Sequence, residues 1–343
     1  IRDVYKRQTR FSRAEMAESR RRGAPRLVPM GRGQCVPPEP GVDYAHVLDL
    51  PPDGMARGLI GVAGAMLGYA IVVPLLTQLF IALGWLVTGA PGTWRQHLAR
   101  ALRYETVDGL IATHLGLAAL IPIVVLLAKF VHHRRSTWIW SVQPGFRWRF
   151  ALLVALVAGV VINVTQVIVK AGDSWGFTAP SDWWVWLIAI LLTSPLQAAA
   201  EEVLFRGYFM NCLGSMGANR WVAVVVSALV FALAHGTQNM WLFADRFTFG
   251  LLAGALVILT GGLEAGIAAH VLNNLFAFGY SVFLGGASVA RGLTSMGWAD
   301  ALWDVTGFLA IALAAWWISR WMTVATRTPD DLVMAELERS GKA

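Results

Sequence analysis

The stretch "WWVWLIAILLTSPLQAAAEEVLFR", residues 183–206, is a long apolar run that ends in two carboxylates and a guanidinium. A helix needs about 20 mostly apolar residues to cross a bilayer, and this run has that length. A charged side chain at membrane depth costs on the order of 3 kcal/mol. We therefore expect Glu201, Glu202 and Arg206 to be paired, hydrated or functional.

The composition of the whole chain is that of an integral membrane protein. Of its 343 residues, 56% are hydrophobic and 14% are charged, whereas about a quarter of the residues in a soluble domain are charged. The 16 Trp residues fit the aromatic belts of membrane interfaces. The sequence predicts an all-α polytopic integral membrane helical bundle of about eight transmembrane helices, at 58–88 (bent at Pro74), 107–130, 150–170, 183–208, 221–236, 246–260, 263–284 and 302–322.

Three regions are predicted from the change in composition along the chain. Residues 1–55 are rich in Arg, Gly and Pro without apolar periodicity, so we expect a disordered cytoplasmic tail there. Residues 56–324 form the helical bundle, with its motif core at 183–284. Residues 325–343 form a charged cytoplasmic tail, in which a short helix is expected after Pro329. The sequence opens on Ile1, so Met16 and Met30 are candidate starts, and no cleavable signal peptide is expected.

The positions of Lys and Arg predict the orientation of the bundle. The loop after the second span is basic, whereas the loop at 171–182 contains no Arg, so we expect cytoplasmic N- and C-termini in a prokaryotic cytoplasmic membrane. The segment "TWRQHLARALRYE", residues 93–105, places three Arg on the other side, and its amphipathic pattern indicates an interfacial helix. The net charge of +7 is read as this orientation signal rather than as nucleic-acid binding. The basic loop contains Lys129, Arg134, Arg135, Arg147 and Arg149.

The spacing of the ionisable residues at the end of the fourth span makes the two carboxylates unequal. Glu202 and Arg206 are four residues apart, so they share one helix face in the favourable order. Glu201 is rotated by about 100° from Glu202 and does not share that partner. One carboxylate is thus held by a cation and the other is free to act. A salt-bridged pair at the hydrated end of a span is the alternative interpretation.

Two further segments place polar groups in the following spans. "FALAH", residues 231–235, brings His235 to the end of the fifth span, and "HVLNN", residues 270–274, puts His270 and Asn274 on one helix face. Each segment alone is compatible with packing or interhelical hydrogen bonding. Together with Glu201, and with Gln197 one turn before it, they supply a base, two imidazoles and carboxamides. Such a set can activate water and stabilise an oxyanion.

The ordered triple "EEVLFR", "FALAH" and "HVLNN" resembles the EExxxR, FxxxH and HxxxN motifs of the CPBP family of intramembrane proteases, relatives of the CAAX prenyl protease and of Abi-type bacteriocin-processing and immunity proteins. The resemblance covers residues 183–284 and implies an eight-helix bundle with a cavity open to the cytosol. It implies that Glu201 and His235 activate water and that His270 and Asn274 form the oxyanion hole. Glu202 and Arg206 would support Glu201.

A zinc ion and several other functions remain as alternatives. The family has been described as metal-dependent and as glutamate-dependent, and Glu201, His235 and His270 are three possible Zn ligands. The sequence has no HExxH motif. The expected partners are the lipid bilayer and a peptide or protein substrate at the membrane, and no nucleic acid. A non-proteolytic immunity or scaffold protein is the second hypothesis, ahead of a transporter, since no internal repeat is found.

The remaining polar residues and motifs are assigned no catalytic role. "GDSWG", residues 172–176, matches GxSxG but follows a span rather than a strand, so it is read as a turn. Cys35 and Cys212 have no metal-type spacing and indicate no disulfide framework. His114, Asn163 and Gln166 are expected to form interhelical hydrogen bonds, and His132 and His133 are assigned to the basic loop.

Overall fold

The computed structural model describes residues 35–169 and 176–339, and these residues form helices linked by loops, with two isolated β-bridges. The predicted all-α class is confirmed. The motif at 172–176 lies almost wholly outside the described residues. In chain order the elements are η1 (Tyr44–His46), α3 (Gly54–Leu67), η2 (Gly68–Val72), α4 (Val73–Val87), α5 (Trp94–Leu102), α6 (Val107–Ala118), α7 (Leu120–Phe130), α8 (Thr137–Trp140), α9 (Trp148–Val169), α10 (Trp183–Glu202), η3 (Val203–Phe209), α11 (Met210–Ser215), α12 (Arg220–Leu233), α13 (Met240–Thr260), α14 (Glu264–Phe283), α15 (Ala287–Arg291), α16 (Trp298–Trp321) and α17 (Asp330–Arg339).

Six helical stretches in the described part of the chain are long and apolar enough to cross a membrane. The chain is thus a multi-span helical membrane protein. The other two predicted spans exist as helices but do not meet this measure. α12 has 14 residues, and α14 has 20 residues but carries His270, Asn273 and Asn274, which lower its hydropathy. The six stretches are Gly54–Val87, Val107–Phe130, Trp148–Val169, Trp183–Ser215, Met240–Thr260 and Trp298–Trp321.

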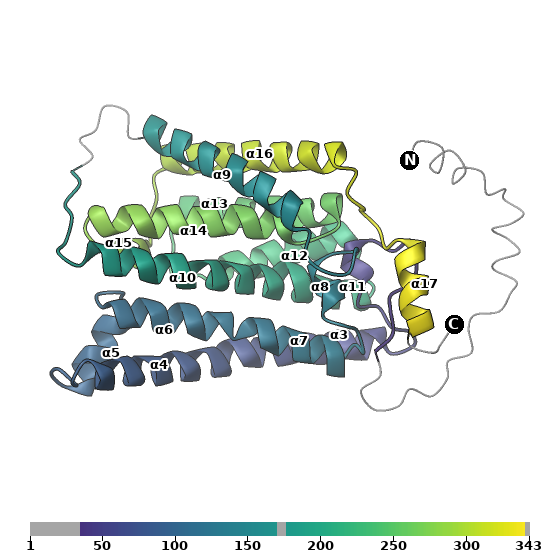
Figure 1. Cartoon of the computed structure of the whole chain (residues 1–343), viewed down its shortest axis with the longest axis horizontal. Coiled ribbons are helices and arrows are strands. Elements are labelled where there is room, and N and C mark those ends of the chain that lie inside the picture. The colour runs from purple at the N-terminus through teal and green to yellow at the C-terminus, as the bar shows by residue number, and fades with distance from the viewer. Residues whose placement is uncertain (1–34, 170–175, 340–343) are drawn as a thin grey trace, which may run out of the picture. The chain divides into compact units, whose positions relative to one another are not determined.

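Two of the helices that carry the sequence motifs, α10 and α14, lie in the middle of the packing order (Figure 1). α10 packs between α6 and α14, and α14 packs between α10 and α9. α16 contacts α9 and α13, and α13 contacts α12. The outer face of α9 exposes Leu152, Leu156, Val160 and Val164 at every fourth position, the pattern of a helix that faces lipid. The polar side chains of α14 are therefore enclosed by other helices rather than by lipid.

The first span is one helix of 34 residues that changes its hydrogen-bonding pattern before Pro74. Proline has no N–H, so residue 74 cannot donate to the carbonyl of Ala70. The chain passes through the π-helical segment η2 at this carbonyl and resumes as α4. Such a π-helical turn is one of the recognised ways in which a helix accommodates the loss of a hydrogen bond.

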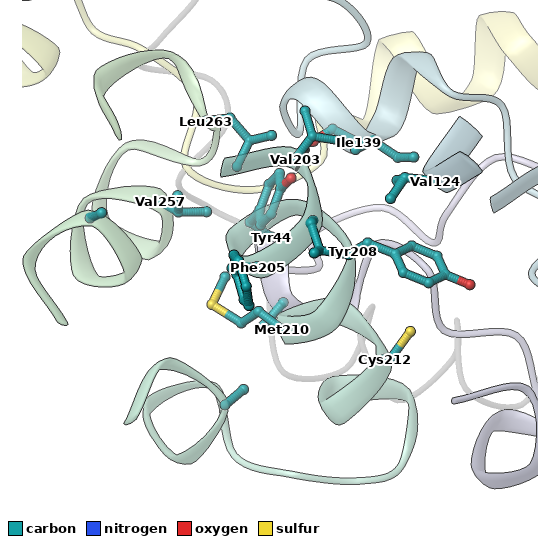
Figure 2. Close-up of a cluster of buried hydrophobic side chains, with 14 of the residues drawn as sticks. Tyr44, Val124, Ile139, Val203, Phe205, Tyr208, Met210, Cys212, Val257 and Leu263 are labelled. Atoms are coloured by element: carbon teal, nitrogen blue, oxygen red, sulfur yellow. Dashed lines mark hydrogen bonds between the residues drawn. The ribbon is translucent and has the colours of Figure 1, made fainter. Parts of the chain in front are cut away.

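Residues 35–53 pack against the bundle, whereas the sequence predicted a disordered tail through residue 55. Tyr44, Val47 and Leu48 are fully buried, and Figure 2 shows Tyr44 among Val203, Phe205 and Ile139. The Tyr44 hydroxyl donates to the Ile139 carbonyl. Burial raises the pKa of Tyr44 well above its usual value, so the hydroxyl remains a donor. These residues occupy a short stretch between Pro40 and Pro51, which is too brief for periodicity to identify.

The C-terminal segment joins the N-terminal one in a structure that we name the terminal clasp, residues 35–53 and 325–339. The Thr328 amide donates to the Val42 carbonyl at 3.0 Å, and the Gly41 amide donates to the Thr328 carbonyl at 2.9 Å. The helix predicted after Pro329 is present as α17. It is anchored to α8 by Trp138, whose Nε1 donates to Glu336 Oε2 at 3.0 Å. The clasp thus fastens both ends of the described chain to one end of the bundle.

Several lone polar residues have the partners that the sequence predicted. His114 Nδ1 lies 2.8 Å from Thr193 Oγ1 on the neighbouring helix α10, and Asn163 on α9 accepts from the Tyr280 hydroxyl on α14. His132 lies in the predicted basic loop, between α7 and α8, and its side chain is fully buried there. It packs against the Tyr208 ring, and burial lowers the pKa of His132 to about 4.

Candidate active site

The end of α10 and one face of α14 share a continuous chain of polar contacts. Asn274 Nδ2 donates to Gln197 Oε1 at 2.8 Å, and Gln197 Nε2 donates to Glu201 Oε1 at 2.7 Å. Glu201 Oε2 lies 3.5 Å from His270 Nε2. Gln197 and Glu201 are one turn apart on α10, as are His270 and Asn274 on α14, so each helix contributes a matching pair of positions. Gln197 therefore links the free carboxylate to the carboxamide of α14.

The second carboxylate, Glu202, joins the same chain from the other side. His270 Nδ1 donates to Glu202 Oε1 at 2.8 Å, and Arg206 NH1 donates to the same oxygen at 3.0 Å. Glu202 and Arg206 are both fully buried. Coulombic attraction to Arg206 and the hydrogen bond from His270 both favour an ionised Glu202. The predicted asymmetry is present: Glu202 is ion-paired with Arg206, while Glu201 has no arginine partner among the described residues.

A π-helical turn follows the two glutamates directly. η3 covers Val203–Phe209, and its loosened carbonyls receive side-chain donors. Ser227 Oγ on α12 donates to the Phe205 carbonyl at 2.7 Å, and Asn211 Nδ2 donates to the Gly207 carbonyl at 2.8 Å. Such turns are rare and are frequent at functional sites. The turn changes the direction of side chains after Glu202, an effect that a regular 3.6-residue period cannot predict.

Aromatic rings pack against the parts of the Arg206 guanidinium that have no hydrogen-bond acceptor beside them. The guanidinium lies 4.1 Å from the centre of the Phe231 ring and 5.6 Å from that of Phe249. Both rings also meet His270 edge to face. Arg206 Nε and NH2 have no hydrogen-bond partner in the described part of the chain, so cation–π attraction replaces hydrogen bonds on these faces. The Phe of "FALAH" is thus a site residue that the sequence analysis did not single out.

His235 is oriented by the unpaired carbonyl groups at the end of α12. Helices leave their last carbonyls without intrahelical donors, and His235 Nδ1 donates to the Phe231 carbonyl at 2.8 Å. Since a carbonyl only accepts, Nδ1 carries the proton and Nε2 is left to accept one. The His235 residue is exposed and lies within electrostatic range of Glu201 and His270. The structure therefore gathers the three motifs on one side of the α10–α14 interface.

Gly266 explains the small residues that precede His270. It lies one turn before His270 on α14, and a Cβ added there would come 3.0 Å from Glu202 Oε2. A larger residue would displace the carboxylate that His270 contacts. The close approach of Glu202 is therefore the physical reason for a glycine one turn before His270.

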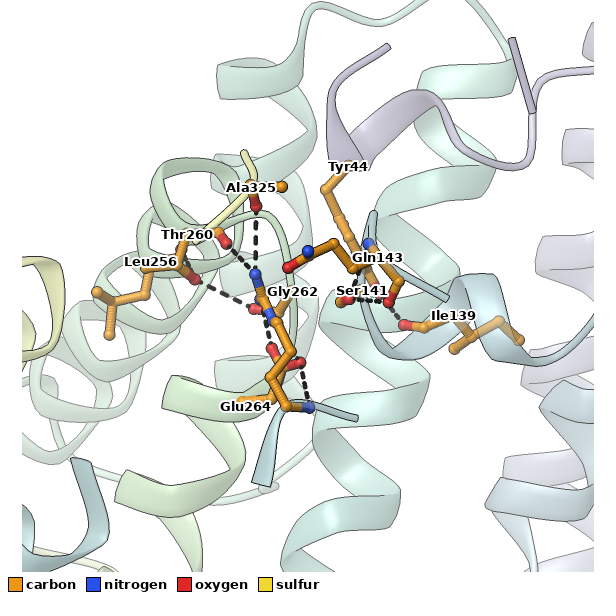
Figure 3. A network of polar contacts seen from close by, with 10 residues as sticks. Tyr44, Ile139, Ser141, Gln143, Leu256, Thr260, Gly262, Glu264 and Ala325 are labelled. Atoms are coloured by element: carbon orange, nitrogen blue, oxygen red, sulfur yellow. Dashed lines mark hydrogen bonds and ion pairs between the residues drawn. The ribbon is translucent and has the colours of Figure 1, made fainter. Parts of the chain in front are cut away.

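A second buried glutamate, Glu264, lies at the start of α14 and was not predicted to matter. Arg147 binds it with two hydrogen bonds, from Nε to Oε1 at 2.8 Å and from NH2 to Oε2 at 2.6 Å. Arg147 NH1 also donates to the carbonyls of Thr260 and Ala325. Figure 3 shows that Glu264, Thr260 and Ala325, which are partners of Arg147, lie close together. The network ties the start of α14 to the end of α13 and to the clasp.

The arrangement does not fit the predicted three-ligand zinc site. His270 directs Nδ1 to Glu202 and Nε2 towards Glu201, and His235 binds the Phe231 carbonyl through Nδ1. Among residues 35–169 and 176–339, no three His, Cys, Asp or Glu side chains are grouped as a metal ion requires.

Asn273 has a smaller part than Asn274, since among the described residues its Nδ2 contacts only Asn274 Oδ1, at 3.3 Å.

Comparison with known proteins places these residues in a family region. Residues 181–276 match the model of the type II CAAX prenyl endopeptidase Rce1-like family, and the match contains all six predicted site residues. The chain is also similar to "Uncharacterized protein YyaK" of Bacillus subtilis (strain 168), with 24% identity over 191 residues. The alignment covers 52% of this chain and 63% of that protein. No solved structure matches the chain.

Proposed function

The chain carries an Rce1-like type II CAAX prenyl endopeptidase domain at residues 181–276, and from this premise we propose that it is an intramembrane endopeptidase. Its substrates in this proposal are membrane-associated or lipidated peptides and proteins. The hydrogen-bond chain from Asn274 through Gln197 to Glu201, and from His270 to Glu202, carries the proposal. It aligns a free carboxylate with donors that can face a developing oxyanion.

In the proposed reaction Glu201 and His235 activate water. Water donates one proton to Glu201, and His235 Nε2 accepts a hydrogen bond from the same molecule. The water oxygen bonds to the carbonyl carbon of the scissile peptide, whose C=O electrons move to oxygen. When this intermediate collapses, the C–N bond breaks and Glu201 returns its proton to the leaving amine. Gln197 supports the role of Glu201, because its donated hydrogen bond holds the carboxylate in place.

The developing oxyanion in this proposal is stabilised from α14. Asn274 uses one Nδ2 hydrogen for Gln197 and offers the other to substrate. His270 donates from Nδ1 to Glu202 and, when Nε2 is also protonated, offers that proton to the oxyanion. Glu202 and Arg206 have no direct contact with the reacting atoms in this scheme. They hold the His270 ring in position and are therefore positioning residues.

We further propose eight spans, with α12 and α14 also lying in the bilayer. The outer face of α12 exposes apolar side chains, including Trp221, Val222, Val225 and Leu229. α14 has its polar residues covered by α9 and α10. The basic loop and the clasp then lie on the cytoplasmic side, from which substrate reaches the site. Labelling of cysteines introduced at Asn219 and Arg95 from either side of the membrane tests this orientation.

The decisive experiment compares purified wild type with Glu201→Gln in lipid vesicles that contain mixed lipidated and unlipidated peptides. Mass spectrometry should find cleavage products with wild type and at least about 10²-fold slower cleavage with Glu201→Gln, the usual effect of losing a general base. Both proteins should unfold at the same temperature. Glu105→Gln is the matched control, because Glu105 pairs with Arg103 away from the site. Binding of peptides without cleavage by wild type would overturn the protease and favour a non-proteolytic scaffold.

A further inference from the structure

An arginine without an ion-pair partner lies beside the site on α13. Arg246 NH1 donates to Gln238 Oε1 at 2.8 Å, and Gln238 Nε2 donates to the Ala232 carbonyl at 2.7 Å. The loop that carries Gln238 also carries His235, and both side chains are fixed by carbonyls at the end of α12. Arg246 is therefore held next to the residues proposed to activate water.

The groups near Arg246 do not neutralise its charge. Asp245, Glu201 and His235 lie within electrostatic range of it, but none of them forms a hydrogen bond or an ion pair with it in the structure described. Gln238 is the one hydrogen-bond partner of the guanidinium among the described residues. Arg246 belongs to the apolar span Met240–Thr260. An arginine within a membrane span is costly and normally faces a partner or a polar cavity.

The guanidinium is only half-buried and has N–H groups left to donate. A guanidinium is a planar fork that binds a carboxylate through two parallel hydrogen bonds. Gln238 fixes one corner of this fork and cannot cancel its charge, because an amide is neutral. The site thus holds a preformed cation, beside the scissile-bond position, that lacks only an anion.

Building on the proposed endopeptidase activity, we propose that Arg246 binds a carboxylate of the peptide substrate and thereby sets which bond lies over Glu201. This carboxylate is either the substrate C-terminus or an acidic side chain near the scissile bond. Gln238 is the positioning residue of this anchor. A phosphate of an anionic lipid is the competing occupant, and the peptide is favoured because Arg246 lies next to Glu201 and His235, where the substrate must lie.

The test uses one fluorescent peptide in three forms, with a free C-terminal acid, with a C-terminal amide, and with an amide plus one Glu near its end. Binding is measured to full-length protein carrying Glu201→Gln, so that it does not depend on cleavage. The acid should bind about ten- to hundredfold more tightly than the amide, the range of a charge-assisted hydrogen bond. Restored binding of the third peptide would assign the anchor to an acidic side chain as well as to the C-terminus.

Variants of the anchor separate it from a structural role. Arg246→Gln should abolish the preference for the acid without lowering the unfolding temperature, because it removes an unpaired charge. Arg246→Lys should retain part of the preference. Gln238→Glu should abolish it, since a fixed carboxylate then occupies the guanidinium. The control is Arg95→Gln, which removes an exposed arginine of α5 and should leave the preference unchanged.

The outcomes distinguish the anchor from the proposed activity. Equal binding of acid and amide would overturn the anchor even if wild type cleaves both peptides. A preference for the acid that depends on Arg246, in a wild-type protein that cleaves nothing, would keep the anchor and overturn the protease. Binding that depends on anionic lipid and on Arg246, but is equal for the three peptides, would assign the anion to the membrane and contradict our proposal.

Discussion

Two buried glutamate–arginine pairs meet at α14, since Glu264 lies on this helix and Glu202, at the end of α10, accepts a hydrogen bond from its His270. The two pairs have the same chemistry, but their hydrogen-bonding groups are satisfied to different extents. Glu264 and Arg147 form a two-fold hydrogen bond, and the other donors of Arg147 reach backbone carbonyls. Glu202 and Arg206 share a single hydrogen bond at 3.0 Å. Glu202 Oε2, Arg206 Nε and Arg206 NH2 have no partner in the part of the chain that the structure describes. The two glutamates are thus similarly buried but not similarly satisfied.

This difference teaches how to separate a structural ion pair from one that serves a site. The Glu264 pair joins three segments and uses every strong donor, so it fixes the fold. The Glu202 pair gives one oxygen to both Arg206 and His270 and leaves aromatic rings on the remaining guanidinium face. A pair that is merely stabilising would be expected to use its remaining atoms. The Glu202 pair instead orients an imidazole, at the expense of its own hydrogen bonding.

The strongest test of the comparison is Glu264→Gln. It leaves the Arg147 charge buried without its carboxylate, and loss of one partner of a buried pair costs about 3–5 kcal/mol. We expect a lower unfolding temperature in detergent and a turnover per folded molecule close to that of wild type. Glu105→Gln, at an exposed pair, should change neither. A folded variant with low turnover would place Glu264 in the site and remove the distinction between the pairs.

The complementary change, Glu202→Gln, should affect turnover more than stability. The amide oxygen can still accept from His270 Nδ1, but a neutral acceptor holds His270 more weakly, so we expect turnover to fall by about 10²–10³-fold, as for the loss of one oxyanion donor. The loss of stability should be smaller than in Glu264→Gln, because one hydrogen bond rather than two is lost and aromatic rings still face the Arg206 guanidinium. Turnover and thermal unfolding of the same preparation measure both effects. Equal stability losses in this variant and in Glu264→Gln would contradict the inference that the two pairs differ in how fully their hydrogen-bonding groups are satisfied.

The sequence predicted the helices and the three motifs because both depend on local spacing. Apolar runs of sufficient length identified the six stretches that are long and apolar enough to cross a membrane. The four-residue spacing correctly placed Arg206 on Glu202, and Asn274 one turn after His270. The Glu264–Arg147 pair joins residues 117 positions apart, and no local pattern relates them. Phe231 was read as an ordinary apolar residue, because its contact with Arg206 exists only after α12 packs on η3. The clasp was missed because its buried residues occur in a short, Pro- and Gly-rich stretch.

Asn274→Ala tests the end of the hydrogen-bond chain that runs from Asn274 through Gln197 to Glu201, which is separate from both ion pairs. Removal of one oxyanion donor should lower kcat by about 10²-fold or more with little change in KM. Asn273→Ala is the matched control on the adjacent residue. It removes one weak contact, at 3.3 Å, so its effect should be less than about tenfold. Similar losses in both variants would show that the two carboxamides act together and not as the spacing predicts.

Gly266→Ala tests whether the unsatisfied Glu202 oxygen needs its present position. The added Cβ would come 3.0 Å from Glu202 Oε2, and overpacking of this kind costs about 1–3 kcal/mol. We expect lower turnover, because the carboxylate must shift by a few tenths of an ångström and its contact with His270 is weakened. Gly279→Ala on the same helix is the control, since a Cβ there meets no atom within 4 Å. It should be neutral or slightly stabilising, as Ala is the better helix former. Full activity of Gly266→Ala would show that His270 does not depend on this contact.

The smallest expected effect is that of metal removal, for which we predict no change in turnover. His270 has both ring nitrogens directed at carboxylates, and a zinc ligand would need one of them for the metal. Dialysis of purified wild type against a chelator, followed by elemental analysis and the peptide assay, measures the effect. His270→Ala, analysed in parallel, should lose turnover without losing bound metal. Two results together would contradict this prediction. They are stoichiometric zinc in wild type that is absent from His270→Ala, and loss of activity on chelation. Glu202 would then be the partner that orients a metal ligand, and the oxyanion role of His270 would be wrong.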